Sequence, residues 1–247
     1  MEHGSLGVIG GMGPKATSVF FEKIINKTSA DIDQDHINII ILNHTSLPDR
    51  TDVLRKKEGD LFLDKISKDM ALLHNAGVSN IAIPCNTAHC FYNEMQEMTT
   101  IPIINMVNET LKLVVDKFGS GSRMGILATD GTLHNGIYSK ECENLELKLY
   151  KPNEEIQKRI MSIIYKKLKK NQHVEPAEIE EIIEMLLSDF GCDCVVIACT
   201  ELSGIPLRQN IKRHCIDAMD VLVEKSILRS GKRVIASDFH NTCITER

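Results

Sequence analysis

The sequence predicts an α/β fold made of two similar halves, each a mostly parallel sheet with flanking helices. Apolar runs of four to six residues alternate along the chain with amphipathic stretches, as in parallel strands joined by crossover helices. One pattern also occurs twice: a glycine stands eight residues before a cysteine at Gly77 and Cys85, and again at Gly191 and Cys199. A short apolar run lies inside each interval, and small polar residues follow each cysteine.

The repeat continues beyond the cysteines, because Leu6–Gly10 (LGVIG) resembles Met124–Ala128 (MGILA). These segments are offset by about 118 positions and the two cysteines by about 114. A near-constant offset indicates two equivalent units. We therefore predict an N-terminal half over residues 1–105 and a C-terminal half over residues 106–214, with a last helical segment, 215–247, that packs back on the first half.

Eight segments are predicted as strands because each is a short apolar run. They are Leu6–Ile9, Ile37–Leu42, Ile81–Ile83, Pro102–Ile104, Met124–Leu127, Leu145–Tyr150, Val195–Ala198 and Cys215–Ile216. Amphipathic segments predict helices; Pro14 and Pro176 suit a first helical turn, and Gly77 and Gly191 suit a helix end. The predicted helices are Pro14–Lys27, Gly59–Asn75, Thr87–Met98, Val107–Phe118, Leu133–Glu143, Glu154–Lys170, Pro176–Phe190 and Ala218–Arg229.

The bulk composition disfavours several classes of protein. Hydrophobic content of 43% and charged content of 26% are ordinary for a globular chain of 247 residues. The formal net charge of −5, the absence of Trp and the small number of Tyr argue against a nucleic-acid-binding protein. The chain has no run of about 18 apolar residues and its N-terminus lacks a secretory pattern, so we expect no membrane association.

The eight cysteines suggest reduced thiols in a cytoplasmic protein, since no signal sequence accompanies them. Their spacing does not predict a metal site, because Cys192 and Cys194 form a C-x-C pair without a second ligand pair. The loop Gly10–Pro14 lets backbone approach an anion, and its Met12 is a candidate substrate contact. It lacks G-x-G-x-x-G and the P-loop lysine, so we expect no nicotinamide cofactor and no bound nucleotide.

Cys85 and Cys199 are the candidate catalytic residues. Each is predicted at the carboxyl end of a parallel strand, where ligands bind in open α/β sheets, so the site should lie between the halves. A buried structural thiol is the ordinary interpretation of a single cysteine, but the duplication favours catalysis. Two thiols on opposite faces of one carbon can remove a proton from one side and return a proton to the other. The other six cysteines are interpreted as structural.

Polar residues near the strand ends are candidate substrate contacts. Asn86, Thr87 and Thr200 follow the cysteines, and simple helix capping is the alternative interpretation for them. Glu201 also lies near a strand end. Backbone N–H groups around these residues could stabilise a carbanion's charge.

Two further positions offer cations to a substrate carboxylate. Arg50 can hold a carboxylate by two hydrogen bonds, or be a solvated loop residue. Lys158 and Arg159 offer a second cation, although basic residues on helices are usually solvated. His89, four residues after Cys85, is expected to be a hydrogen-bonded structural histidine.

Three motifs together resemble the aspartate/glutamate racemase family, most closely its aspartate racemase branch. They are Gly10–Pro14 (GGMGP), Pro84–His89 (PCNTAH) and Ala198–Leu202 (ACTEL), in the family's order, within a similarity over nearly the whole chain. The resemblance implies two Rossmann-like halves related by a pseudo-twofold axis. It also implies racemisation without pyridoxal phosphate, metal or other cofactor, and a homodimer.

The resemblance also implies roles for individual residues. Cys85 and Cys199 match the family's catalytic cysteines, and Arg50 matches an arginine that holds a substrate carboxylate. Thr129 matches a polar substrate contact. The family's second cation is commonly a lysine near the start of the helix predicted at Glu154–Lys170, where this chain offers Arg159, with Lys158 beside it.

The sequence therefore predicts a cofactor-independent racemase that interconverts L- and D-aspartate. A glutamate racemase or a broad aspartate/glutamate racemase is an alternative, as is a decarboxylase, an isomerase or a hydantoin racemase of the same fold. A non-enzymatic protein that binds a dicarboxylic amino acid is a more distant alternative, which the two thiols disfavour.

Overall fold

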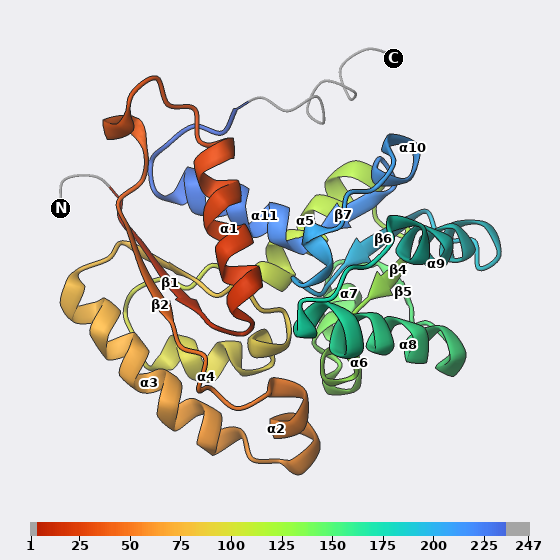
Figure 1. Cartoon of the computed structure of the whole chain (residues 1–247), viewed down its shortest axis with the longest axis horizontal. Coiled ribbons are helices and arrows are strands. Elements are labelled where there is room, and N and C mark those ends of the chain that lie inside the picture. The colour runs from red at the N-terminus through yellow and green to blue at the C-terminus, as the bar shows by residue number, and fades with distance from the viewer. Residues whose placement is uncertain (1–3, 236–247) are drawn as a thin grey trace.

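Two parallel sheets form the centres of the two halves in a computed structural model that describes residues 4–235 (Figure 1). The first sheet has the order β2-β1-β3 and the second has the order β5-β4-β6-β7. The strands of the first sheet are β1 (Leu6–Gly10), β2 (Ile39–Asn43) and β3 (Asn80–Ala82). Those of the second are β4 (Arg123–Leu127), β5 (Lys148–Tyr150), β6 (Cys194–Ile197) and β7 (Cys215–Asp217). The expected α/β architecture is confirmed.

The register brings equivalent strands to the centre of each sheet. Leu6 of β1 is opposite both Ile39 and Asn80. In the second sheet, Met124 of β4 is opposite Leu149 and Cys194. Central strands buried on both faces are apolar along their whole length, which explains why β1 and β6 read as continuous apolar runs.

Helices cover both faces of each sheet. The helices of the first half are α1 (Pro14–Lys27), α2 (Arg50–Lys56), α3 (Gly59–Ala76) and α4 (Tyr92–Glu97). The later helices are α5 (Met106–Phe118), α6 (Asp130–Asn135), α7 (Ile137–Asn144), α8 (Glu154–Met161), α9 (Pro176–Ser188), α10 (Gln209–Lys212) and α11 (Ala218–Arg229). As predicted, Pro14 and Pro176 begin their helices, and Gly77 ends α3 with a φ of 69°.

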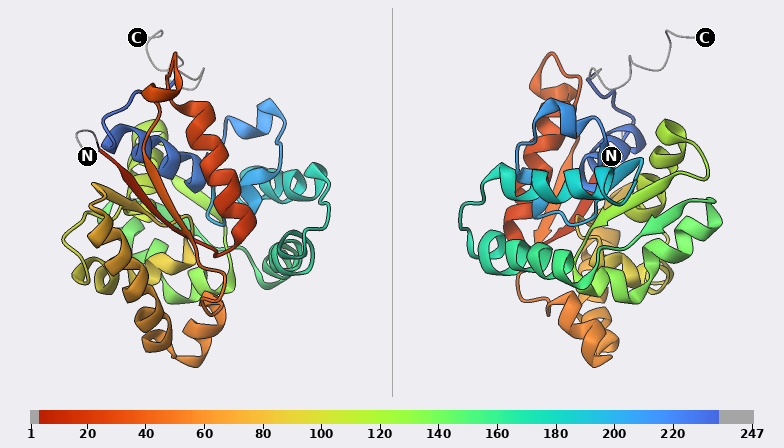
Figure 2. Two further views of the ribbon diagram at one scale, coloured as in Figure 1. Left: turned by 60° about the vertical axis from the view of Figure 1, so that its left-hand side comes forward. Right: turned by 90° about the vertical axis from the view of Figure 1, so that its right-hand side faces the viewer.

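The last described helix, α11, contacts both halves. It lies beside α1 over one face of the first sheet (Figure 1 and Figure 2), where Leu222 packs in one cluster with Leu6 and Phe20. Its Val221 belongs to a cluster of the second half with Leu111 of α5. β7, which precedes α11, pairs with β6, so residues 215–217 lie in the second sheet rather than on the first half. The division at residues 105 and 214 remains a prediction.

Several predicted elements differ from the structure. Pro102–Ile104 forms only an isolated bridge between Ile81 and Ile103. The segment predicted as a helix from Thr87 starts with a 3₁₀ turn before α4. Gly136, with a φ of 77°, separates α6 from α7. The predicted helix Glu154–Lys170 is α-helical only to Met161, then π-helical and finally 3₁₀.

Among residues 4–235, no helix is long and apolar enough to cross a membrane. The structural interpretation of Cys243 lies outside the described residues.

Candidate active site

Cys85 and Cys199 line the same small pocket between the halves. Cys85 follows β3 after two intervening residues, and Cys199 follows β6 after one; each precedes a 3₁₀ turn. Both side chains are buried, at 5% and 7% exposure. The pocket has a volume of about 20 Å³, roughly the space of one or two water molecules. The thiols therefore lie in a nearly closed site.

Residues from both halves form the pocket walls. Its lining residues are Met12, Asp49, Arg50, Thr51, Cys85, Asn86, Thr87, Thr129, Tyr165, Lys169, Ala198, Cys199, Thr200 and Glu201. Nine of the ten residues predicted for the site are in this set. Asp49, Thr51, Tyr165 and Lys169 were not predicted as site residues.

Burial strongly disfavours the thiolate form of Cys199. It raises the pKa of Cys199 to about 12, assisted by the negative charges of Glu201 and Cys85. The backbone N–H of Glu201 and the ammonium of Lys169 act in the opposite direction but are outweighed. In this conformation the Cys199 thiol is therefore protonated at neutral pH.

Arg50 is the first residue of α2 and is buried rather than solvated. Its Nη1 donates to the Pro48 carbonyl at 2.7 Å and its Nη2 donates to the Met12 carbonyl at 3.2 Å. Its Nε is buried without a hydrogen-bond partner among the described residues, and the guanidinium makes no ion pair with them. A buried guanidinium with donor capacity left over is suited to hold a carboxylate.

Arg159 does not lie at the pocket, contrary to the sequence prediction. Its guanidinium is turned toward α9, where Nη2 is 2.8 Å from Glu181. Lys158 is exposed and pairs with Glu154. The reason is geometric: both lie in the last turn of α8, whereas the pocket is lined by Lys169, which follows the π-helical segment Ser162–Lys167.

Lys169 reaches across to the first half. Its Nζ is 2.8 Å from Asp49 Oδ2 and lies over the ring of Tyr165. The Tyr165 hydroxyl is within 3.2 Å of both Asp49 carboxylate oxygens and 3.0 Å from Thr51 Oγ1. Asp49 also caps α2 by accepting from the Thr51 backbone N–H. These contacts join the halves at the pocket.

The polar residues after Cys85 are held by side chains of the second half. The Tyr138 hydroxyl donates to Asn86 Oδ1 at 2.6 Å, and Asn86 Nδ2 is buried without a partner among the described residues. Thr87 Oγ1 is 3.0 Å from Thr129 Oγ1 and 2.9 Å from Thr132 Oγ1. Asn86 makes no capping hydrogen bond, so helix capping does not account for it.

Glu201 is a half-buried acid that makes no ion pair with the described residues. Burial raises the pKa of its carboxyl, although Lys169, the Gly13 backbone N–H and Arg50 lower it in part. A Cβ atom at Gly13 would lie 2.7 Å from Glu201 Oε1, so glycine permits this close approach. The carboxylate thus remains available for a cationic group.

His89 has the hydrogen bonds of a structural residue, in accord with its interpretation from sequence. Its Nδ1 is 2.9 Å from the Cys85 carbonyl, and its Nε2 lies 3.2 Å from the Met106 backbone N–H. Burial lowers the pKa of the imidazole, which is therefore neutral. A neutral ring that donates from Nδ1 and accepts at Nε2 fits both contacts.

A sequence model of the Asp/Glu/Hydantoin racemase family matches residues 9–226. The chain therefore belongs to this family, and it is an isomerase of the amino-acid racemase class. A curated relative, the broad specificity amino-acid racemase RacX of Bacillus subtilis, is 28% identical over 209 residues, which cover 81% of this chain and 86% of the relative.

Solved structures agree with this assignment. The aspartate racemase of Picrophilus torridus superposes with a TM-score of 0.77 and 29% identity, covering 94% of this chain and 96% of that chain. The glutamate racemase of Campylobacter jejuni superposes with a TM-score of 0.61 and 12% identity, covering 95% and 88%, which shows the shared fold alone.

Proposed function

We propose that this protein interconverts L- and D-aspartate by a two-thiol mechanism. The observation that carries the proposal is the pocket itself, in which equivalent strands of the two halves each contribute a cysteine. The aspartate racemase of Picrophilus torridus, which superposes over nearly the whole chain, supports aspartate as the substrate.

In one direction the Cys85 thiolate takes the proton from Cα of the substrate, and the Cys199 thiol gives its proton to the opposite face. Cys85 ends as the thiol and Cys199 as the thiolate, so the next turnover from the product enantiomer uses them in reversed roles. The carbanion places negative charge on the α-carboxylate oxygens. Backbone N–H groups near Asn86 and Thr200 would stabilise that charge.

The charges in the pocket match a dicarboxylic amino acid. Arg50 and Lys169 supply two cations for the two carboxylates, and Glu201 supplies an anion for the ammonium group. Met12, Thr87 and Thr129 would complete the walls around the substrate. Because the thiols supply both base and acid, the proposed reaction needs no cofactor or metal.

A broad-specificity racemase is the second candidate. It is favoured by the similarity to the broad specificity racemase RacX, which covers most of both chains. Glutamate belongs to the same alternative, because its two carboxylates could use the same cations. The remaining alternatives are a decarboxylase, a cis–trans isomerase and a hydantoin racemase. Their substrates lack the ammonium group that Glu201 would bind, so the pocket charges favour them less.

The decisive experiment is hydrogen exchange in D2O, followed by NMR. We expect the protein to exchange the α-hydrogen of L-aspartate and to form D-aspartate, more slowly or not at all with neutral amino acids. The panel includes glutamate, substituted malonates, maleate and hydantoins. Inertness toward both acidic amino acids would contradict the racemase proposal, and turnover of another member would redefine the reaction.

Removing either thiol tests the mechanism. We expect Cys85→Ala and Cys199→Ala each to lower kcat at least about 100-fold, since each removes one of the two proton-transfer groups. Cys90→Ala is the matched control, because Cys90 is partly exposed and does not line the pocket. Wild-type turnover in either pocket variant would exclude a two-base mechanism.

We further propose that the protein acts in the cytoplasm as a homodimer. Free thiols at all seven described cysteines are compatible with a reducing compartment. Light scattering coupled to size-exclusion chromatography should give twice the chain mass of 27.7 kDa. A monomer with full activity would remove the homodimer from the proposal.

A further inference from the structure

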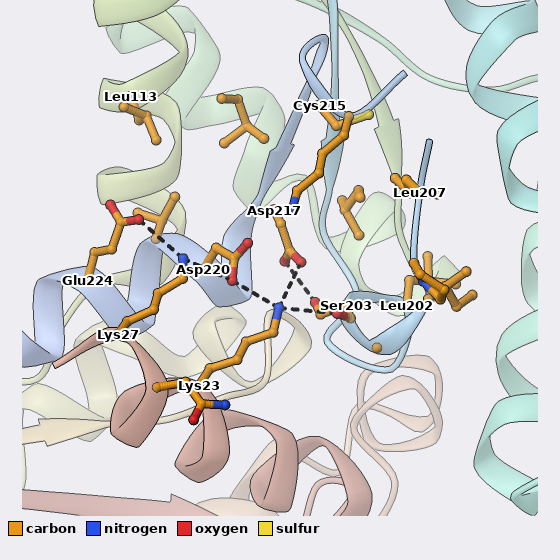
Figure 3. A pocket seen from close by; sticks show the side chains of 18 of the residues that line it. Lys23, Lys27, Leu113, Leu202, Ser203, Leu207, Cys215, Asp217, Asp220 and Glu224 are labelled. Atoms are coloured by element: carbon orange, nitrogen blue, oxygen red, sulfur yellow. Dashed lines mark hydrogen bonds and ion pairs between the residues drawn. The ribbon is translucent and has the colours of Figure 1, made fainter. Parts of the chain in front are cut away.

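The 3₁₀ turn that follows the second thiol borders a large cavity, which shares no lining residue with the thiol pocket. This cavity, about 480 Å³ in volume, lies between α1, α11 and the segment 202–207 (Figure 3). Ser203, in the turn Leu202–Gly204, is one of its lining residues. An open cavity leaves this side of the turn without close packing, so other contacts must restrain it.

A polar network that includes Lys23 of the first half supplies that restraint. Lys23 of α1 donates from Nζ to the Ser203 carbonyl at 3.1 Å and to Asp220 Oδ1 at 2.9 Å. The Ser203 hydroxyl donates to Asp217 Oδ1 at 2.7 Å, and Asp217 Oδ2 is 3.6 Å from Lys23 Nζ. Figure 3 shows that Asp217, Asp220 and Ser203 converge on the Lys23 ammonium. Both the carbonyl and the hydroxyl of Ser203 are therefore held.

The turn transmits this restraint to Cys199 over a few bonds. The Leu202 backbone N–H donates to the Cys199 carbonyl at 3.0 Å, and the Ser203 N–H is 3.4 Å from the Thr200 carbonyl. The Glu201 backbone N–H interacts with the Cys199 thiol itself. A shift of Ser203 would consequently move the groups that surround the thiol, including the Glu201 N–H that donates toward its sulfur.

We propose that Lys23 is a positioning residue for the second thiol: a cation of the first half fixes the turn that follows Cys199 and Glu201 in the second half. The kinetic part of this inference rests on the proposed racemase function. The geometric part, that Lys23 sets the environment of Cys199, is independent of it.

Lys27 provides a matched control one turn along α1. Its ammonium pairs with the same Asp220, at 3.3 Å, and with Glu224. Among the described residues it makes no hydrogen bond or ion pair with Ser203 or Asp217. Lys23→Met and Lys27→Met therefore remove the same charge from the same helix. Only the first removes the connection to the turn.

The experiment compares these two variants with wild type by alkylation with iodoacetamide, followed peptide by peptide by mass spectrometry. We expect Lys23→Met to change the alkylation rate of Cys199 at least about threefold while Cys85 is unaffected, and Lys27→Met to change neither. Equal effects of the two variants on Cys199 would overturn the proposal.

Kinetics provide the second readout. We expect Lys23→Met to lower kcat about tenfold or more with a change in KM below about twofold, because misplacement of a reacting group affects the chemical step. Ser203→Ala keeps every lysine and should change kcat and the Cys199 alkylation rate in the same direction as Lys23→Met. It keeps the test valid if Lys23→Met does not fold. One outcome separates the two claims: the wild-type protein does not racemise aspartate, while the Cys199 alkylation rate changes in Lys23→Met and Ser203→Ala and not in Lys27→Met. That result would contradict the proposed racemase function and support the positioning role of Lys23.

Discussion

The cations of the pocket come from both halves of the molecule. Arg50 and Lys169 both line the pocket, one from each half, whereas Arg159 is held by Glu181 on the surface. Lys169 already pairs with a carboxylate, that of Asp49. A substrate carboxylate at Lys169 would therefore compete with Asp49 for the ammonium, so in the proposed reaction substrate binding would disrupt that ion pair.

This assignment predicts different kinetic effects for a variant of Lys169 and a variant of Arg159. We expect Lys169→Met to raise the KM for aspartate at least about tenfold, because a charge-assisted hydrogen bond to the substrate is lost. Arg159→Met should leave kcat and KM within about twofold of wild type, since its partner is an exposed glutamate. Steady-state kinetics with L-aspartate measure both. If Arg159→Met raised KM and Lys169→Met did not, Arg159 rather than Lys169 would be the cation that contacts the substrate.

The loop between β1 and α1 depends on a backbone conformation that glycine adopts without strain. Gly11 has a φ of 85°, and a Cβ atom there would lie 2.4 Å from the carbonyl carbon of His44. The loop thus packs directly on the backbone that follows β2. Its position brings Met12 into the pocket, where the Met12 carbonyl accepts a hydrogen bond from Arg50.

We expect Gly11→Ala to lower the free energy of unfolding by more than about 1 kcal/mol, because both the positive φ and the backbone contact oppose a methyl group. Gly204→Ala is the control, since Gly204 has no positive φ and no atom within 4 Å of the added Cβ. Urea denaturation followed by circular dichroism gives both values. A Gly11→Ala protein as stable as the control would mean that the loop readily adopts another path.

Sequence patterns predicted the elements whose signals are local. The helix Pro14–Lys27 has its bounds as predicted because a proline begins it and apolar residues recur at helical spacing. Lys169 was not predicted as a site residue because the prediction treated residues 154–170 as one continuous α-helix. The π-helical turns after Met161 change the rotation per residue, so the direction of later side chains cannot be read from spacing alone.

The helix α2 was also missed, although it had a recognisable start. Asp49 is an N-cap residue that accepts from the Thr51 and Asp52 backbone N–H groups. The segment is short, and a seven-residue helix shows too little periodicity to be separated from a loop. The pairing of Tyr165 with Asp49 and Thr51 depends on how the halves meet, which no local pattern contains.

At the scale of the molecule, the two cores are linked by α11. Leu222 is fully buried against the first half, while Val221 packs with α5 and β4 of the second. We expect Leu222→Ala to lower the free energy of unfolding by about 2–5 kcal/mol in a single cooperative transition. Leu228→Ala, on the exposed side of the same helix at 54% exposure, should cost less than about 0.5 kcal/mol. Two separated transitions in urea would show that the halves unfold independently.

The ion pair between Asp49 and Lys169 makes the contact between the halves dependent on pH. Burial raises the pKa of Asp49, but Lys169 and the Asp52 backbone N–H outweigh it and the pKa lies below the ordinary 3.8. Burial lowers the pKa of Lys169, but Asp49 outweighs it and the pKa lies above the ordinary 10.5. The Asp49 carboxylate thus contributes to stability above its unfolded pKa, and this contribution is lost as the pH falls through its folded pKa. The Lys169 ammonium contributes below its unfolded pKa, and its contribution is lost as the pH rises through its folded pKa.

We therefore expect Asp49→Asn to be less stable than wild type near pH 6, with the difference shrinking as the pH falls from about 4 toward about 2, through the lowered folded pKa of Asp49. Asparagine is also a good N-cap, so the loss reports the charge rather than the helix start. Asp52→Asn, at an exposed position of the same helix, is the control. A stability difference that is constant between these pH values would contradict a role for the ion pair.

The sharing of α11 has a consequence for synthesis on the ribosome. The sheet of the first half is complete once β3 has been made, but Leu6, Val8 and Phe20 bury their apolar surfaces partly against a helix that begins only at Ala218. The nascent N-terminal segment must therefore wait, with part of its hydrophobic surface uncovered, until nearly the whole of the described chain has emerged.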